Sequence, residues 1–413
     1  MSLIDTWAAT GAGAFTLSEN GLYTVDAWEI FLDRLKKNGI FTVARWYNPR
    51  VVHETGRVLS LAVSTLQRRN IVEYHKHIAL ISSGNVSVLL LSPQPFSDPD
   101  IAKMREVVDK YKYQFVITPG QLPKDPVFRQ IFSARSEAGL AEIGKGGYFN
   151  FDAPTDNKPY FFNMLRLEKI FVPIMHPGVA RGNMLATSTL MQLILALSVL
   201  CVITIIVPLW LRRSLQKEKT AGVLWSGAFY FILIGAGFML VEIGLIQTLS
   251  VFLGHPSYAL GILLFTIIAS TGCGGYLSER LPLMEKPFVY VYAPATAVLI
   301  LLTHKLLQFA TDAMVASSMS AKIFASIAFI FPLGICMGFF FPTGMRLVRS
   351  IADADTPWYW ALNGVFGVLC SALAVFISIY FGIAVNFYAG FVCYFLVLFC
   401  ILRIDSLKTQ AAL

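Results

Sequence analysis

The stretch GFMLVEIGLIQTLSVFLGHPSYALGILLFTIIASTGCGGYLSERL, residues 237–281, decides the class of this chain. It holds two apolar runs, each able to cross a hydrocarbon core of about 30 Å, with a turn at His255 and Pro256 between them. A window of roughly 19 residues moved along the chain predicts further runs of this kind. The candidate spans are 188–211, 224–250, 257–278, 287–306, 321–345, 357–381 and 383–402.

The first part of the chain differs in composition from the second. Residues 1 to about 185 mix charged residues, proline and short apolar runs, as globular domains do. The whole chain of 413 residues is 56% apolar and only 14% charged, which is too apolar for an ordinary soluble protein. We therefore expect a soluble domain at 1–150, a connector at 151–186, a transmembrane helical domain at 187–404 and a tail at 405–413.

The positive charge is distributed in a way that indicates a lipid bilayer as partner and not a nucleic acid. The net charge of +8 reflects an excess of basic residues, and those of the second half gather in alternate loops, as in the positive-inside pattern. They are Arg212, Arg213, Lys217, Lys219, Arg280, Lys286, Arg346, Arg349, Arg403 and Lys408. This pattern predicts a cytoplasmic C-terminus.

The soluble part alternates between helix and strand patterns. YTVDAWEIFLDRL, residues 23–35, has one apolar helical face, and IFTVARW, residues 40–46, is rich in strand formers. HIALISSGNVSVLLLSP, residues 77–93, predicts two strands joined by a tight turn, and residues 98–120 predict a helix followed by a strand. The pattern indicates an α/β fold, with about half of a doubly wound sheet followed by an antiparallel hairpin.

Several long motifs resemble the multi-spanning, spermidine synthase-like proteins of bacteria. They are residues 2–46, FDAPTDNKPYFFN at 151–163, residues 237–281, GICMGFFFPTGMRLV at 334–348 and WYWALNGVFGVLCSALAVFISIYFG at 358–382. The resemblance implies the C-terminal half of a Rossmann-like, aminopropyltransferase or methyltransferase-fold sheet. It also implies S-adenosylmethionine or decarboxylated S-adenosylmethionine as donor, and an amine or a lipid-soluble molecule as acceptor.

The glycine-rich loop that would hold such a donor has no counterpart in these 413 residues. The run GAG at Gly11 to Gly13 does not replace it, because the third glycine of a dinucleotide-binding fingerprint is missing at the required spacing. We therefore expect the nucleotide-binding half to come from preceding sequence or from a separate N-terminal half. On its own, this chain is expected to be inactive.

The resemblance also implies catalytic residues. Aminopropyltransferases carry an Asp-x-x-Asp pair whose first carboxylate helps to deprotonate the attacking amine. Asp5 matches the first position, whereas Ala8 occupies the second, so the pair is incomplete and diamine recognition is not implied. Tyr23, with Glu19, is a further candidate from the following loop and helix. The alternatives are a strand-end cap for Asp5 and a packed aromatic for Tyr23.

No metal site is expected in the soluble part. His75 and His77 are alternate residues at the entrance of a predicted strand, and no third ligand lies nearby in the sequence. The stretch PTDNKPYFF, residues 154–162, is expected to be a rigid connector whose aromatics, Phe161 and Phe162 among them, rest at the membrane interface. The alternative is a substrate-gating role.

The membrane part supplies a second set of candidates. Glu242 lies inside an apolar span, where an ionised carboxylate is costly and is by default a functional candidate. Gln247, His255 and Asn363 are the other polar candidates. Glu242 either belongs to a transport or proton path or, paired with amides, fixes the packing of the helices.

Two functions follow, and whether the chain is an enzyme stays open. One is transfer of an aminopropyl or methyl group at the plasma (inner) membrane. The other is a membrane transporter or scaffold with a degenerate nucleotide-binding domain. Because the donor is cytoplasmic, we expect a cytoplasmic soluble domain, which requires the first or the last candidate span to be re-entrant or interfacial.

Overall fold

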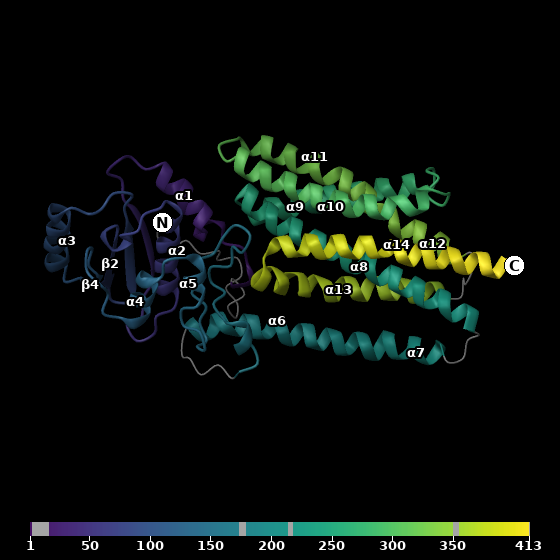
Figure 1. Ribbon diagram of the computed structural model, residues 1–413, viewed down its shortest axis with the longest axis horizontal. Coiled ribbons are helices and arrows are strands. Elements are labelled where there is room, and N and C mark those ends of the chain that lie inside the picture. Colours follow the sequence, from purple (N-terminus) through teal and green to yellow (C-terminus); the bar gives the residue numbers. More distant parts are fainter. Residues whose placement is uncertain (2–15, 173–178, 214–217, 350–354, 413) are drawn as a thin grey trace. The chain divides into compact units, whose positions relative to one another are not determined.

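The computed structural model (Figure 1) describes residues 1, 16–172, 179–213, 218–349 and 355–412. The chain divides into two compact units, Met1–Thr189 and Leu190–Leu413, and each is described by itself.

The first unit combines helices with a sheet of four strands in its described part. The strands are β1 (Phe41–Trp46), β2 (Ile78–Ser83), β3 (Val86–Leu91) and β4 (Gln114–Ile117). The helices are α1 (Val25–Asp33), α2 (Glu54–Arg68), α3 (Asp98–Tyr111), α4 (Pro126–Ser133) and α5 (Glu137–Ala141). The strands and helices expected from residues 23–35, 40–46, 77–93 and 98–120 are all present.

The strand order is β1-β3-β2-β4, and each neighbouring pair is antiparallel. The β2–β3 hairpin turns at Gly84, whose φ of 56° lies in the left-handed region that favours glycine, and this confirms the expected hairpin. The parallel pairing of a doubly wound sheet is not found among the described strands. The reason is that β3 inserts between β1 and β2, which run in the same direction.

Helix α2 forms the centre of this unit. Every residue from Glu54 to Leu66 is buried, which is unusual for a helix that carries Glu54, Arg57 and several hydroxyl groups. The core around it includes Trp28 of α1, Val43 of β1 and Phe128 of α4. Burial of polar groups on this helix requires partners for them, and these partners form the contacts described below.

The segment expected as a connector packs on the first unit. Two isolated bridges, Phe149 with Leu165 and Thr155 with Lys158, fold it back on itself. Phe161 and Phe162 are fully buried in the core. The expectation that these aromatics rest at a membrane interface is therefore wrong, because the core of the globular unit takes them up.

The second unit is helical, and α6 enters it from the first unit. Its elements are α6 (Val179–Cys201), the short π-helix η6 (Val202–Ile206), α7 (Val207–Arg213), α8 (Glu218–Leu253), α9 (Pro256–Ser278), α10 (Phe288–Ala313), α11 (Met319–Gly338), α12 (Phe340–Arg349), α13 (Thr356–Phe381) and α14 (Ile383–Ala412). Figure 1 shows α8, α13 and α14 side by side, and α8 contacts both.

Seven helical stretches in the described part of the chain are long and apolar enough to cross a membrane. They are Met184–Leu211, Leu224–Leu253, Pro256–Ser278, Phe288–Ala313, Met319–Arg349, Thr356–Phe381 and Ile383–Leu407. They match the seven spans expected from the sequence and are consistent with a multi-pass membrane protein. The first and the last stretch are long enough to cross like the others, so length alone gives no reason to treat either as re-entrant.

Candidate functional site

A buried ion pair lies at the centre of the first unit. Arg45 on β1 and Glu54 at the start of α2 are 2.7 Å apart, and 2% of each side chain is exposed. Arg45 also donates to the phenol oxygen of Tyr23 at 3.2 Å. The pair joins the sheet to the central helix. Its charges are withdrawn from water into the protein interior, where the lower dielectric constant makes Coulomb attraction stronger.

Aromatic rings surround the Arg45 guanidinium. Its carbon atom lies 4.7 Å from the ring centroid of Phe162, 5.4 Å from that of Tyr23 and 5.8 Å from that of Phe161. Tyr23 stacks on Phe161 with centroids 4.6 Å apart. Cation–π attraction therefore adds to the ion pair, and the aromatic rings pack around the guanidinium within the core.

These contacts bear on the predicted catalytic residues. Tyr23 is 1% exposed, and its phenol accepts a hydrogen bond from Arg45. This buried environment fits the interpretation of Tyr23 as a packed aromatic residue. Asp5 lies outside the described residues. Glu19 accepts a hydrogen bond from the Tyr160 hydroxyl at 3.3 Å.

Arg57 ties α2 to the segment that follows the sheet. Its side chain donates to four backbone carbonyl oxygens, those of Asp152, Tyr160, Phe161 and Asn163. Burial lowers the pKa of Arg57 to about 10, against an opposing effect of the Asp152 charge. Residues 152–163 have little regular secondary structure, so the guanidinium supplies these carbonyls with the donors that a helix or sheet would otherwise provide.

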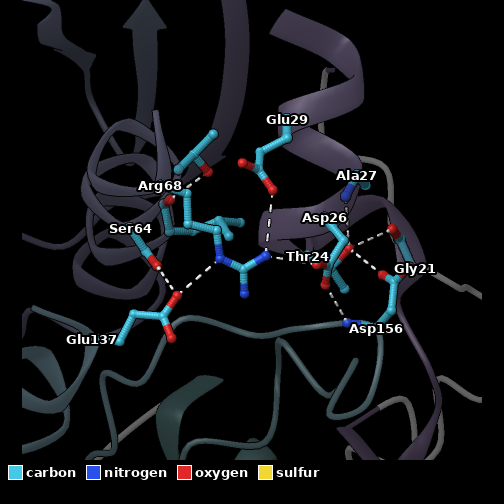
Figure 2. Close-up of polar contacts among 11 residues, drawn as sticks. Gly21, Thr24, Asp26, Ala27, Glu29, Ser64, Arg68, Glu137 and Asp156 are labelled. Carbon is cyan, nitrogen blue, oxygen red and sulfur yellow. Dashed lines mark hydrogen bonds and ion pairs between the residues drawn. The ribbon is translucent and has the colours of Figure 1, made fainter. Parts of the chain in front are cut away.

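A second, more exposed network surrounds Arg68 near the end of α2 (Figure 2). Arg68 bonds Asp26 at 2.7 Å and Glu137 at 2.9 Å, with Glu29 at 3.4 Å. Burial lowers the pKa of Arg68, but the hydrogen bonds to Asp26 and Glu137 outweigh it and raise the pKa above its ordinary value. The network joins α1, α2 and α5.

The same network reaches the folded-back segment. The second oxygen of Asp26 accepts from the backbone N–H of Asp156 at 2.8 Å, and the Asp156 carboxylate accepts from the Thr24 hydroxyl at 2.6 Å. Thr24 also caps α1 by accepting from the N–H of Ala27. Figure 2 shows these side chains converging between α1 and the segment around Asp156. These hydrogen bonds hold the segment around Asp156 against the start of α1.

The two histidines considered in the sequence lie in different surroundings. The His77 ring nitrogen Nδ1 lies 3.0 Å from the carbonyl oxygen of Ser92, and the side chain is buried. His75 is partly exposed. Among the residues that the structure describes, no group of three or more His, Cys, Asp or Glu side chains is placed to hold a metal ion.

In the second unit, Glu242 lies inside the span Leu224–Leu253 and is partly buried. Within the described ranges, no hydrogen bond or ion pair reaches its carboxylate. Gln247 does not pair with it, because five residues along a helix of 3.6 residues per turn place the two side chains on different faces. The predicted pairing of Glu242 with amides is not observed there.

Gln247 instead joins three helices. Its side-chain oxygen accepts from the Ser378 hydroxyl of α13 at 2.5 Å. Asn386 of α14 donates to the Ser378 oxygen at 2.7 Å and to the Ala374 carbonyl at 3.1 Å. All three polar side chains are buried. Interhelical hydrogen bonds of this kind fix helix packing in membranes.

The other two membrane candidates occupy different places. Asn363 on α13 donates to the Phe231 carbonyl of α8 at 3.2 Å and borders a cavity of ≈ 690 Å³. His255 precedes α9 as its N-cap residue without a capping side-chain bond, and its ring packs edge-on against Tyr258 with centroids 5.2 Å apart. The structure thus places Glu242, Gln247, His255 and Asn363 at separate positions.

Sequence reasoning did not single out Arg45, Glu54, Arg57 or the cavity. One signal was available: Arg45 falls two residues after Val43 in FTVARW, on the face of the strand that points inward. A charged residue at such a position requires a partner of opposite charge. The cavity has no counterpart in a sequence pattern, because several helices form it jointly.

Comparisons of the chain with protein-family models, with characterised proteins and with solved structures return no match.

Proposed function

We propose that this chain is a multi-pass protein of the plasma (inner) membrane whose globular unit takes part in group transfer. The transferred group is an aminopropyl or methyl group from an S-adenosylmethionine-type donor, and the acceptor is an amine or a lipid-soluble molecule. The sequence resemblance to spermidine synthase-like membrane proteins is the origin of this proposal. Donor-binding residues must come from other sequence, in a longer form of the protein or in a separate N-terminal half.

One structural observation supports the proposal. Strands β1 and β2 run in the same direction, since each is antiparallel to β3, and α2 connects them. A strand, a helix and a second strand of equal direction form the crossover on which Rossmann-like sheets are built. The order β1-β3-β2 is compatible with the C-terminal half of such a sheet in which the hairpin strand is inserted.

The roles proposed for individual residues follow from their surroundings. Asp5 remains the proposed acceptor of the amine proton. We assign Tyr23 a positioning role, because its phenol is bonded to Arg45 and is buried. Arg45 and Glu54 hold the segment that leads into α1 against the central helix.

The side of the membrane tests the proposal, because the donor is a cytoplasmic metabolite. Gln121 suits an added reporter cysteine, since it is exposed and lies beside Gly120, the positive-φ position of the loop after β4. Glu279, exposed beside the basic residue Arg280, supplies the matched cytoplasmic position. Gln121→Cys and Glu279→Cys are treated with a membrane-impermeant maleimide, with the parent chain as blank.

We expect both reporter cysteines to be protected in intact cells and labelled after permeabilisation. Labelling of Gln121→Cys in intact cells, with Glu279→Cys protected, would place the globular unit outside and overturn the group-transfer proposal. Seven complete crossings would give this second result, so the experiment decides between the span count and the resemblance.

A membrane transporter or scaffold is the second candidate. It is favoured by Glu242, a carboxylate inside an apolar span without a bonded partner in the described part of the chain. Such residues in transporters commonly lie on ion or proton paths.

A further inference from the structure

We propose that the helical unit binds an uncharged lipid with one long apolar chain in the cavity bordered by Asn363. This inference is independent of group transfer and of the side on which the globular unit lies. The cavity has a volume of ≈ 690 Å³, within the range of about 300 to 1,000 Å³ that is typical of small-molecule sites.

The cavity is formed jointly by several helices that are separated in the sequence. Its lining residues come from α8, α9, α11, α12, α13 and α14. None of them carries a charge. All of these lining segments lie within stretches able to cross a membrane, so the apolar phase of the bilayer is the source of molecules that can enter.

Glycines create the space. We call Gly235, Gly272, Gly275, Gly338, Gly364 and Gly367 the cavity glycines. An added Cβ at Gly272 or Gly364 would meet no atom within 4 Å. These two glycines therefore do not serve close helix contact, unlike Gly338, where an added Cβ would meet the backbone of Thr271.

The depth of the cavity follows from the positions of its residues along their helices. Lining residues of α9, from Ile268 to Gly275, belong to the C-terminal half of that helix. Those of α13 from Asn363 to Val368 belong to its N-terminal half, and Ser371 lies just past the midpoint. Both halves are the ones nearer to the basic loops. The site therefore lies in the leaflet that adjoins the basic loops.

Polar atoms in the cavity define the class of ligand. One hydrogen of the Asn363 amide donates to the Phe231 carbonyl, and the Ser371 hydroxyl donates to the Val368 carbonyl at 2.8 Å. What remains is the second amide hydrogen of Asn363 and acceptor capacity on the Asn363 and Ser371 oxygens, a set that a hydroxyl group can both donate to and accept from. A ligand with a hydroxyl donor and a long chain satisfies these oxygens and the apolar lining, whereas a carboxylate or a phosphate meets no cation.

The test uses a diazirine-bearing long-chain alcohol as photoactivatable probe on the full chain in membranes. The variants are Gly272→Leu and Gly364→Leu, which add side chains to the cavity at positions where an added Cβ has open space. Gly261→Leu is the matched control, because Gly261 lies on α9 and also has open space around an added Cβ but does not line the cavity. Leucine favours a helix more than glycine does, so all three changes are compatible with folding.

We expect labelling to fall at least several-fold in Gly272→Leu and Gly364→Leu and to stay at the parent level in Gly261→Leu. An excess of unlabelled alcohol should compete, and an excess of the corresponding fatty acid should not. Equal labelling of the parent and all three variants would overturn the proposal.

A second measurement does not depend on the variants. Mass spectrometry of the labelled parent chain should find the probe on residues 234–239 and 363–371. Labelling distributed over the outward side chains of α6 and α10, with these two segments unlabelled, would show that the probe samples only the lipid-facing surface and would overturn the site.

Discussion

Arg45 and Glu54 form an ion pair of 2.7 Å in which 2% of each side chain is exposed to solvent. Arg69 and Asp33 are paired at a similar distance, 2.6 Å, but their side chains are 27% and 63% exposed. The two ion pairs therefore differ in burial and hardly in distance. A buried pair is expensive to break because the remaining charge cannot be hydrated, while an exposed pair contributes little.

Removal of Arg45 should therefore destabilise the globular unit far more than removal of Arg69. We expect Arg45→Met to lower the free energy of unfolding by about 3 to 5 kcal/mol, and Arg69→Met by at most about 1 kcal/mol. Pulse proteolysis of the full chain in detergent, over a urea series, measures both. The double variant Arg45→Met, Glu54→Leu should recover part of the loss of Arg45→Met. Equal losses for Arg45→Met and Arg69→Met would contradict the conclusion that burial makes the Arg45–Glu54 pair costly to break.

Arg57 supports a different prediction, because its partners are backbone carbonyls. Arg57→Met leaves four carbonyl acceptors without this donor. Each carbonyl that stays buried and unsatisfied should lower the free energy of unfolding by about 1 to 3 kcal/mol at most. Arg57→Lys should restore only part, since an ammonium lacks the planar fork. The local readout is faster proteolysis within residues 148–166. Unchanged protection of that segment in Arg57→Met would contradict the role.

The pH dependence of this group has a definite sign. The folded pKa of Arg57, about 10, lies below the ordinary pKa of an arginine, so the unfolded state binds more protons at pH values between the two. Stability due to Arg57 therefore rises with pH only above about pH 10. At neutral pH both states are charged, and the effect of Arg57→Met should be the same at about pH 6 and about pH 8.

His77 gives a pH effect in the accessible range. Burial lowers the pKa of His77 below its ordinary 6.5, against the hydrogen bond to the Ser92 carbonyl, which raises it. Below pH 6.5 the unfolded state then takes up a proton that the folded state does not, so stability falls as the pH falls. The parent chain should lose more stability between about pH 7.5 and about pH 5.5 than His77→Gln does. His75→Gln, at a partly exposed position, is the control and should follow the parent.

Much of the fold could be predicted from the sequence because local patterns determine it. Seven apolar runs correspond to seven helical stretches long enough to span in the part of the chain that the structure describes, and the tight turn expected within residues 77–93 is a real hairpin. The strand order could not be read from such patterns, since β3 pairs with β1 across a long stretch of chain. For the same reason the partners of Arg45 and Arg57, which lie on other elements, were not foreseen.

The helix contacts of the second unit depend on particular glycines. An added Cβ at Gly274 on α9 would meet the carbonyl oxygen of Ile335 on α11, and no flexible side chain can yield there. Gly274→Ala should therefore lower the melting temperature of the detergent-solubilised chain by several degrees. Gly261→Ala, on the same helix with open space around the added Cβ, should leave it unchanged or raise it slightly. Similar values for both variants would show that α9 and α11 can separate without cost.

Replacement of Glu242 distinguishes between a role in a proton path and a role in helix packing. An ionised acid at the centre of a membrane helix costs about 2.5 to 3.5 kcal/mol on insertion scales, so Glu242→Gln should keep or slightly raise the stability of the chain. If the carboxylate carries protons, the same variant should abolish proton movement in proteoliposomes that contain a pH-sensitive dye, while the exposed Glu279→Gln retains it. A packing role requires the opposite pattern: loss of stability in Glu242→Gln and no proton movement in the parent chain. The lack of a bonded partner for Glu242 in the described part of the chain favours the first pattern, because a residue that fixes helix packing must bond to a neighbouring helix.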